Sequence, residues 1–282
     1  MESESYLERP VVEPYTPPSP VRQRPPWYKR AGGAIAAAAV LIAKFAAKLK
    51  LLLVLLPKVK LFTTAGSMLV SVAAYSLIWG WKFAAGFVVL LLVHEMGHVI
   101  QLRREGVPAS APLFIPFMGA VVGMKKLPDD AAAEARVGLA GPVLGSVGAL
   151  GAAAIWLATG SDLFRALAFI AFFLNLFNLL PVLPLDGGRA MSALTPWMWL
   201  VGYAALIAVA IFFPNPIVLI ILVFGGIELY RRWKLRKTPE AERYYKVAPT
   251  SRIAIALVYI GLAVALAYGM HVTHLPRTLN SV

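Results

Sequence analysis

Three polar residues stand together inside an otherwise apolar segment, VVLLLVHEMGHVI: His94, Glu95 and His98. In an α-helix, residues i and i+4 lie on one face with Cβ atoms about 6 Å apart, so both histidines can direct a ring nitrogen at one metal ion. Glu95 lies about 100° further around the helix and flanks that ion. In this His-Glu-x-x-His spacing the histidines typically bind zinc and the glutamate is general base for an attacking water.

The alternative for this cluster is a polar contact that joins two membrane helices. Ionisable groups inside a span are costly, and such a contact does not explain three of them within five residues. Gly97, between Glu95 and His98, is expected to leave the helix face beside the metal open.

A catalytic zinc ion needs a third protein ligand, and catalytic sites keep one position open for water. The chain has no cysteine, so that ligand is His, Asp or Glu. His271 and His274 follow the last expected span and are interpreted as solvated flanking residues. The better candidate is Asp186, which follows an apolar segment directly.

The segment around Asp186, NLFNLLPVLPLDGGRA, is built to break a helix at membrane depth. Pro181 and Pro184 stop the preceding helix, and the two glycines after Asp186 allow tight turns. Irregular backbone is tolerated at that depth where it lines a cavity within the protein. The alternative is that Asp186 only caps the N-terminus of a helix over residues 188–195.

The composition places these residues in a membrane protein. Hydrophobic residues make up 59% of the 282 residues, charged residues only 15%, and the mean hydropathy is +0.72. Soluble chains carry roughly 25% charged residues, so a soluble enzyme is excluded. The net charge of +13 comes from basic residues beside apolar runs, which favours cytoplasmic loops over nucleic-acid binding.

We expect an all-α polytopic membrane protein with about six or seven transmembrane helices. Four regions are expected: a disordered Pro-rich cytoplasmic tail (1–30), an interfacial basic and apolar helix (31–60), a membrane-embedded core (61–250), and a C-terminal transmembrane helix with a short tail (251–282). The expected spans are 62–80, 82–102, 136–158, 163–180, 197–213, 216–230 and 252–270.

Within residues 107–130, the run PLFIPFMGAVVGMKK is too short for a helical span and is broken by prolines and glycines, which predicts a β-hairpin or re-entrant element at the cytoplasmic side. Its free edge would accept a substrate as an added strand, with Gly119, Ala120 and Val121 as binding residues. The alternative is a loop that merely packs against the helices. Basic loops predict that the N-terminus is cytoplasmic.

Two motifs together resemble those of the site-2 protease family of intramembrane zinc metalloproteases. They are HEMGH and the later run from Asn178 through Pro181 and Pro184 to Leu185-Asp186-Gly187-Gly188, in the family's order and span context. The resemblance covers roughly residues 60–230. The segment GLAGPVLGS also resembles a small-residue segment of the family, and its glycines at 138, 141, 145 and 148 form a stripe for close helix packing.

The resemblance implies one zinc ion per chain, bound by His94, His98 and Asp186, and a water activated by Glu95. It also implies Asn178 as a contact to the substrate backbone, with an amide hydrogen bond between helices as the alternative. The implied reaction is hydrolysis of a peptide bond in or near a transmembrane segment of a membrane protein.

The expected partners are such a membrane protein and the lipid bilayer, with no nucleic acid; the sequence leaves the oligomeric state open. The expected location is the cell inner or plasma membrane. A multi-pass zinc transporter is the alternative function, but transport predicts ligating groups at several depths of the membrane.

Overall fold

A computed structural model describes residues 63–212 and 216–274. These residues all belong to one compact unit, Leu56–Val282. The predicted tail at 1–30 and the predicted interfacial helix at 31–60 lie outside the described residues.

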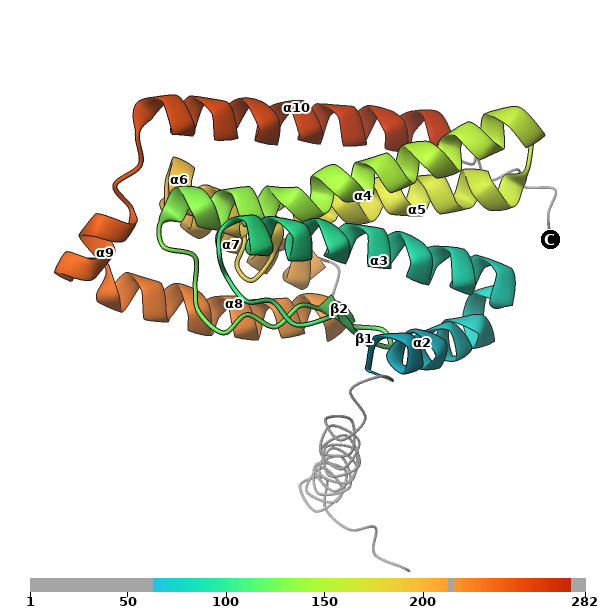
Figure 1. Ribbon diagram of the computed structural model, residues 1–282, viewed down its shortest axis with the longest axis horizontal. Coiled ribbons are helices and arrows are strands. Elements are labelled where there is room, and N and C mark those ends of the chain that lie inside the picture. The colour runs from blue at the N-terminus through green and yellow to red at the C-terminus, as the bar shows by residue number, and fades with distance from the viewer. Residues whose placement is uncertain (1–62, 213–215, 275–282) are drawn as a thin grey trace, which may run out of the picture. The chain divides into compact units, whose positions relative to one another are not determined.

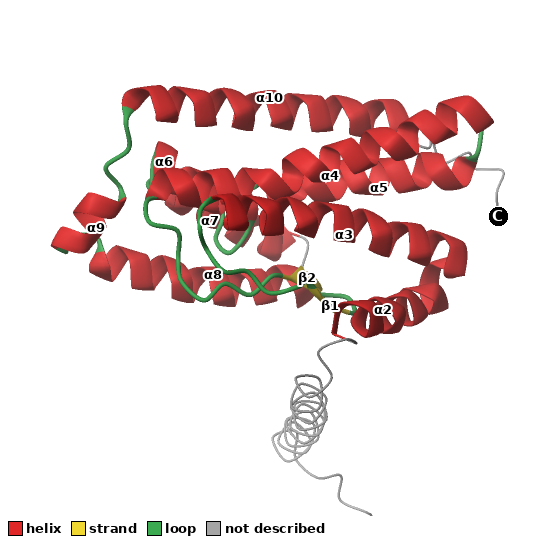
Figure 2. Ribbon diagram, in the orientation of Figure 1, coloured by secondary structure: helices red, strands yellow, loops and turns green. Residues whose placement is uncertain are grey.

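The described fold is mostly helical with one small antiparallel sheet (Figures 1 and 2), as the sequence predicted. In chain order the elements are α2 (Thr63–Trp79), α3 (Trp81–Arg104), β1 (Leu113–Ile115), β2 (Gly119–Val121), α4 (Ala131–Thr159), α5 (Asp162–Asn178), α6 (Asp186–Leu194), α7 (Met198–Phe212), α8 (Pro216–Leu235), α9 (Pro239–Tyr244) and α10 (Pro249–Thr273).

Three of the described helices, α3, α4 and α10, are long and apolar enough to cross a membrane, which fits an integral membrane protein. The helices α2 and α7 are apolar but shorter. Each of the seven segments predicted as spans coincides with a helix. Helix length and composition identify three candidate spans, so the predicted count of six or seven stays a prediction.

Helix α4 is the centre of the packing and contacts α3, α5, α6 and α10. Figure 1 shows α4 beside α5, with α10 along one side and α3 along the other. The glycine stripe of α4 lets α3, α5 and α6 approach its backbone closely. The two helices that carry the zinc ligands expected from the sequence, α3 and α6, are thus held against one common surface.

The β-hairpin predicted within residues 107–130 is present between α3 and α4 (Figure 2). Phe114 of β1 pairs with Ala120 of β2. The other edge of β1 is covered by polar side chains of α2: the Phe114 N–H donates to the Ser67 hydroxyl at 3.1 Å, and Thr64 donates to the Pro112 carbonyl at 2.8 Å. One edge of the hairpin is therefore fixed to the helical bundle.

Candidate metal centre

Three ligand atoms meet where α3 and α6 face each other. The Nε2 atoms of His94 and His98 are 3.2 Å apart, and the Asp186 Oδ2 atom lies 3.1 Å from the first and 3.2 Å from the second. All three side chains are buried. Among the described residues, this is the group of His, Asp and Glu side chains that could hold a metal ion.

The triangle formed by these atoms has the size that zinc requires. Ligand atoms about 2.0–2.1 Å from a tetrahedral zinc ion are separated from one another by about 3.3 Å. The sides of 3.1 and 3.2 Å are close to this value. Three protein ligands would leave one position of a tetrahedral ion for water or substrate. Imidazole nitrogen and carboxylate oxygen are both ordinary ligands of zinc, so the donor set fits zinc.

The opposite nitrogen of each imidazole has its own acceptor. His94 Nδ1 lies 2.8 Å from the Asn175 side-chain oxygen, and His98 Nδ1 lies 2.8 Å from the Val137 carbonyl. The Asn175 amide nitrogen donates to the Ala171 carbonyl at 2.7 Å, which turns its oxygen toward the imidazole. Each ring can thus donate Nδ1–H and present an unprotonated Nε2 to the metal.

Asp186 is the first residue of α6, and the N-cap position is occupied by Leu185, with no side-chain capping bond. The alternative in which Asp186 acts as a helix N-cap is therefore wrong. Its carboxylate points instead at the two imidazoles. The chain break predicted from Pro181 and Pro184 does bring this carboxylate to the histidine helix.

Glycines of α4 form the wall behind the ligands. A Cβ atom at Gly141 would overlap His98 Nε2, one at Gly145 would overlap the Asn175 amide, and one at Gly138 would meet the Asp186 carbonyl oxygen at 2.7 Å. The prediction that Gly97 leaves open space beside the metal is wrong. A Cβ there would overlap the Ala140 carbonyl, so Gly97 serves close contact between α3 and α4.

Glu95 lies next to the ligand group but forms no hydrogen bond or ion pair with another described residue. Its side chain is buried, with 9% of the residue exposed. A carboxylate in this position is held close to the candidate metal without being committed to another partner.

The other predicted residues are less closely tied to this centre. Asn178 is half-buried at the end of α5, and its side chain makes no hydrogen bond among the residues described. Gly119, Ala120 and Val121 form β2. His271 and His274 are exposed at the end of α10, as expected.

Sequence reasoning missed Asn175 and the Val137 carbonyl. Asn175 is a polar side chain inside an apolar helix, the same signal that singled out the histidines. A backbone acceptor such as Val137 leaves no such signal in the residue types.

The sequence profile of Peptidase family M50 matches residues 82–161 and 158–222, together half of the chain. The chain belongs to peptidase family M50. This is the site-2 protease family, so the predicted resemblance is confirmed. The matched residues include His94, His98 and Asp186, and all four glycines of the α4 stripe.

Two relatives show the extent of the similarity. A zinc metalloprotease of Methanocaldococcus jannaschii is 30% identical over 162 residues, which are 55% of this chain and 45% of the relative. The protein Rip3 of Mycobacterium tuberculosis is 36% identical over 143 residues, or 46% of this chain and 35% of Rip3. The match thus spans less than half the length of either relative.

Proposed function

We propose that this M50 chain is an intramembrane zinc metalloprotease that hydrolyses a peptide bond in or near a transmembrane segment of a membrane protein. The observation that carries the proposal is the buried triangle of His94, His98 and Asp186 beside Glu95, with both histidines on an apolar helix. The relative from Methanocaldococcus jannaschii, a zinc metalloprotease, supports the same chemistry.

In this proposal His94, His98 and Asp186 hold one zinc ion per chain. When bound, zinc would supply a Lewis acid for the scissile carbonyl and would lower the pKa of a bound water to about 7. Asn175 and the Val137 carbonyl keep the two imidazoles in the ligating tautomer. Glu95 accepts the proton of the attacking water and passes it to the leaving amine.

The substrate must be locally unwound, because the carbonyls of a helix are shielded and hydrogen-bonded. Unwinding exposes N–H and C=O groups, which cost several kcal/mol each when left unpaired in lipid. We propose that β2 pairs with them as a neighbouring strand, with Asn178 as a further contact to the substrate backbone.

The hydrogen bonds of β1 identify the residue that would make the pairing. The Phe114 N–H points away from β2 and donates to Ser67, so Phe114 and Ala120 face each other as a non-hydrogen-bonded pair. In such a pair the N–H and C=O groups of both residues point outward. Ala120 therefore offers one donor and one acceptor on the free edge of the hairpin, whereas Gly119 and Val121 face β1.

The metal and base assignments are tested with the full chain in detergent. Glu95→Gln should retain about one zinc per chain and lose cleavage of a reporter membrane protein, because only the proton acceptor is removed. His98→Ala and Asp186→Ala should lose zinc as well. Full zinc content and cleavage in Asp186→Ala would refute its assignment as a ligand, and retained cleavage in Glu95→Gln would refute its role as the base.

Strand pairing is tested by Ala120→Pro, which removes the outward N–H and leaves the zinc ligands unchanged. Cleavage of the membrane reporter should fall while zinc content stays normal. The matched control is Ala120→Ser, which keeps the N–H and should cleave normally. Wild-type cleavage by the proline variant would show that the substrate is not held by this edge.

The observations give no support to zinc transport. Within residues 63–212 and 216–274 the candidate ligands form one group, not a series at several depths. Zinc flux into vesicles, with no cleavage of any membrane reporter, would reverse this conclusion.

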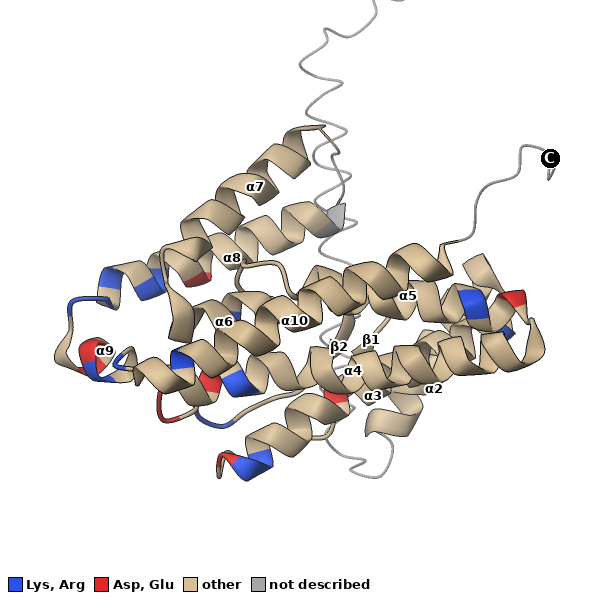
Figure 3. Ribbon diagram, turned by 90° about the horizontal axis from the view of Figure 1, so that it is seen from above, with Lys and Arg blue, Asp and Glu red and all other residues tan. Residues whose placement is uncertain are grey.

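We also propose an inner or plasma membrane location with a cytoplasmic N-terminus. Figure 3 shows charged residues gathered toward the end of the bundle that carries α9. Positive loops mark the cytoplasmic side. Because the chain has no native cysteine, single cysteines at Arg236 and Ser161 can be labelled separately. An impermeant thiol reagent added outside the cell should label position 161 and spare position 236; the reverse would invert the orientation.

A further inference from the structure

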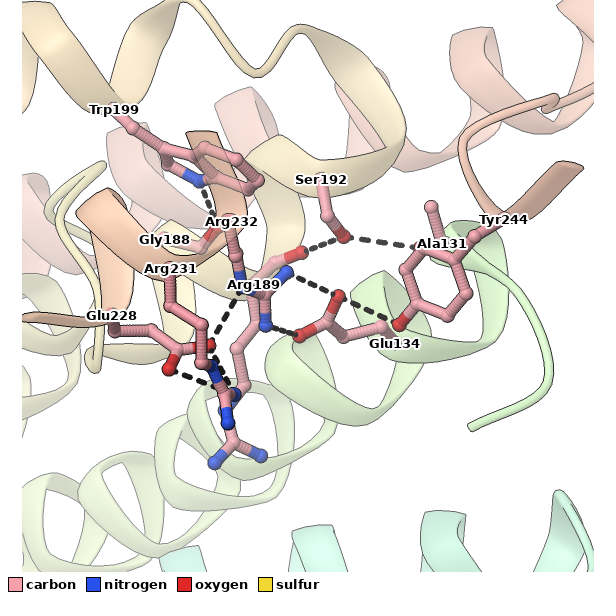
Figure 4. A network of polar contacts seen from close by, with 10 residues as sticks. All are labelled: Ala131, Glu134, Gly188, Arg189, Ser192, Trp199, Glu228, Arg231, Arg232 and Tyr244. Carbon is pink, nitrogen blue, oxygen red and sulfur yellow. Dashed lines mark hydrogen bonds and ion pairs between the residues drawn. The ribbon is translucent and has the colours of Figure 1, made fainter. Parts of the chain in front are cut away.

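A buried polar cluster lies next to the helix that carries Asp186 (Figure 4). It consists of Glu134 on α4, Trp199 on α7, Arg232 on α8 and Tyr244 on α9, and we call these four residues the support cluster. Glu134 and Trp199 are 3% and 4% exposed. Four separate helices thus meet at one set of polar contacts.

An ion pair forms the centre of the support cluster. The Arg232 guanidinium donates to both carboxylate oxygens of Glu134, at 2.9 and 2.5 Å, and its Nε–H donates to Glu228 at 2.8 Å. The Tyr244 hydroxyl donates to Glu134 at 2.9 Å. This two-point geometry fixes the orientation of the Arg232 plane as well as its position.

Arg232 contacts Trp199, and Trp199 in turn is hydrogen-bonded to α6. The guanidinium carbon lies 5.2 Å from the centroid of the Trp199 ring, a cation–π contact. The indole N–H of Trp199 donates to the Gly188 carbonyl at 2.6 Å. Gly188 follows Asp186 by two residues in the first turn of α6.

Glu134 reaches the same site along α4. Val137, one turn further, accepts the His98 Nδ1–H, and Gly138 packs against the Asp186 carbonyl. The cluster therefore joins the first turn of α6 to the α4 surface that supports a histidine. Ser192 adds a second link between the two helices through the Ala131 carbonyl, at 3.3 Å.

We propose that Trp199, Arg232 and Glu134 are positioning residues for the zinc ligand Asp186, an inference that rests on the proposed function. They hold the first turn of α6 so that its carboxylate stands at the two imidazoles. Well-packed apolar residues often stabilise a fold as well as a buried ion pair does. What the ion pair adds here is a fixed direction for α6.

The decisive variant is Trp199→Phe, which keeps an aromatic ring under Arg232 and removes the N–H donated to Gly188. It also makes a buried side chain smaller, so stability is measured separately from zinc affinity. The full chain in detergent is titrated with zinc against a chromogenic chelator. We expect the zinc dissociation constant to rise by about 10- to 100-fold, the usual effect of losing an outer-shell partner. The thermal midpoint of the zinc-free protein should fall somewhat, because buried contacts are lost, and zinc is therefore titrated at a temperature where the variant is fully folded.

The matched control is Arg231→Gln. Arg231 neighbours Arg232 and also pairs with Glu228, but its side chain is 61% exposed and contacts neither Glu134 nor Trp199. It should leave zinc affinity unchanged. If Trp199→Phe lowers the zinc-free midpoint and leaves the affinity unchanged, Trp199 is structural only and the proposal fails.

A second measurement asks whether the cluster acts as a unit. Glu134→Gln should also weaken zinc binding, and adding Trp199→Phe should then cost less than it does alone, because Glu134 acts through Arg232 on the same Trp199–Gly188 bond. Fully additive losses would overturn the shared path.

Asp186→Ala is titrated in parallel. If it binds zinc normally, the ligand assignment fails and the inference fails with it. If it loses zinc while Trp199→Phe binds normally, only the positioning role is wrong.

Discussion

At the scale of single residues, the candidate centre depends on glycines, which lack a Cβ atom, as much as on the ligand side chains. Gly141 provides the space in which both imidazole rings lie, since a Cβ atom there would overlap His98 Nε2 and come within 2.8 Å of His94 Nε2. A glycine within a helix costs roughly 0.5–1 kcal/mol relative to alanine. In exchange, glycine at this position lets both imidazoles lie against the α4 backbone.

Gly141→Ala is therefore expected to displace the His98 ring and weaken zinc binding by more than about tenfold, even though it favours the helix itself. Zinc content after dialysis against a mild chelator measures the effect. Gly151→Ala is the matched control, because a Cβ at Gly151 of the same helix meets nothing within 4 Å. Equal zinc content in both variants would show that the ring tolerates the methyl group.

Asn175 and Asn178 allow a second comparison on one helix. Asn175→Ala removes the partner of His94 Nδ1, so zinc affinity should fall by about 10- to 100-fold. Asn178→Ala should leave zinc affinity unchanged and raise KM for a membrane substrate if the proposed backbone contact exists. A zinc defect in Asn178→Ala together with normal binding in Asn175→Ala would contradict both assignments.

At the scale of elements, α2 and the hairpin form one unit. The turn after β1 places Phe117 at φ 63°, a left-handed conformation that bulky residues rarely adopt. Its N–H donates to the Tyr75 hydroxyl at 3.0 Å, and the two rings meet edge to face with centroids 5.3 Å apart. Helix α2 therefore holds the tip of the hairpin in a strained shape.

Tyr75→Phe keeps the ring contact and removes the acceptor of the Phe117 N–H. The lost bond is expected to cost about 0.5–1.5 kcal/mol locally, seen as a two- to tenfold faster hydrogen exchange in residues 112–121. Ser76→Ala is the control, since that exposed hydroxyl bonds only to Ala73 in its own helix. Unchanged exchange in Tyr75→Phe would show that ring packing alone holds the turn.

The sequence was informative at this scale wherever chemistry or chain breaks were written into residue types. The spacing of His94 and His98 predicted a shared metal, and the prolines before Asp186 predicted a break that brings its carboxylate inward. The glycines and prolines of 107–130 predicted the hairpin. Each is a local pattern with a local physical cause.

Contacts between helices were not predictable in the same way. The sequence does not show whether Gly97 faces open space or the Ala140 carbonyl. That depends on how α4 packs against α3. The Val137 carbonyl and the Trp199–Gly188 bond depend on backbone atoms that every residue carries. Apolar length likewise predicts helices but does not say how many cross the membrane.

At the scale of the whole molecule, bound zinc would tie α3 to α6 across the surface of α4. A ligand that binds only the folded state adds stability as its concentration rises, about 2.7 kcal/mol at one hundred times its dissociation constant. The thermal midpoint of the full chain in detergent should therefore rise with free zinc. His98→Ala should abolish this dependence and exposed His271→Ala should preserve it; a midpoint indifferent to zinc in the wild type would mean that the site does not bind the metal.

The distance along the chain between the histidines and Asp186 has a consequence for biogenesis. About 90 residues separate them, and a ribosome adds roughly 5–20 residues per second. Asp186 is therefore synthesised about 5 to 18 seconds after the histidines, and the helices that carry Trp199 and Arg232 follow later still. If the three side chains bind zinc as proposed, the site is incomplete until Asp186 has been added, and the nascent histidines offer only two of the three ligands before then.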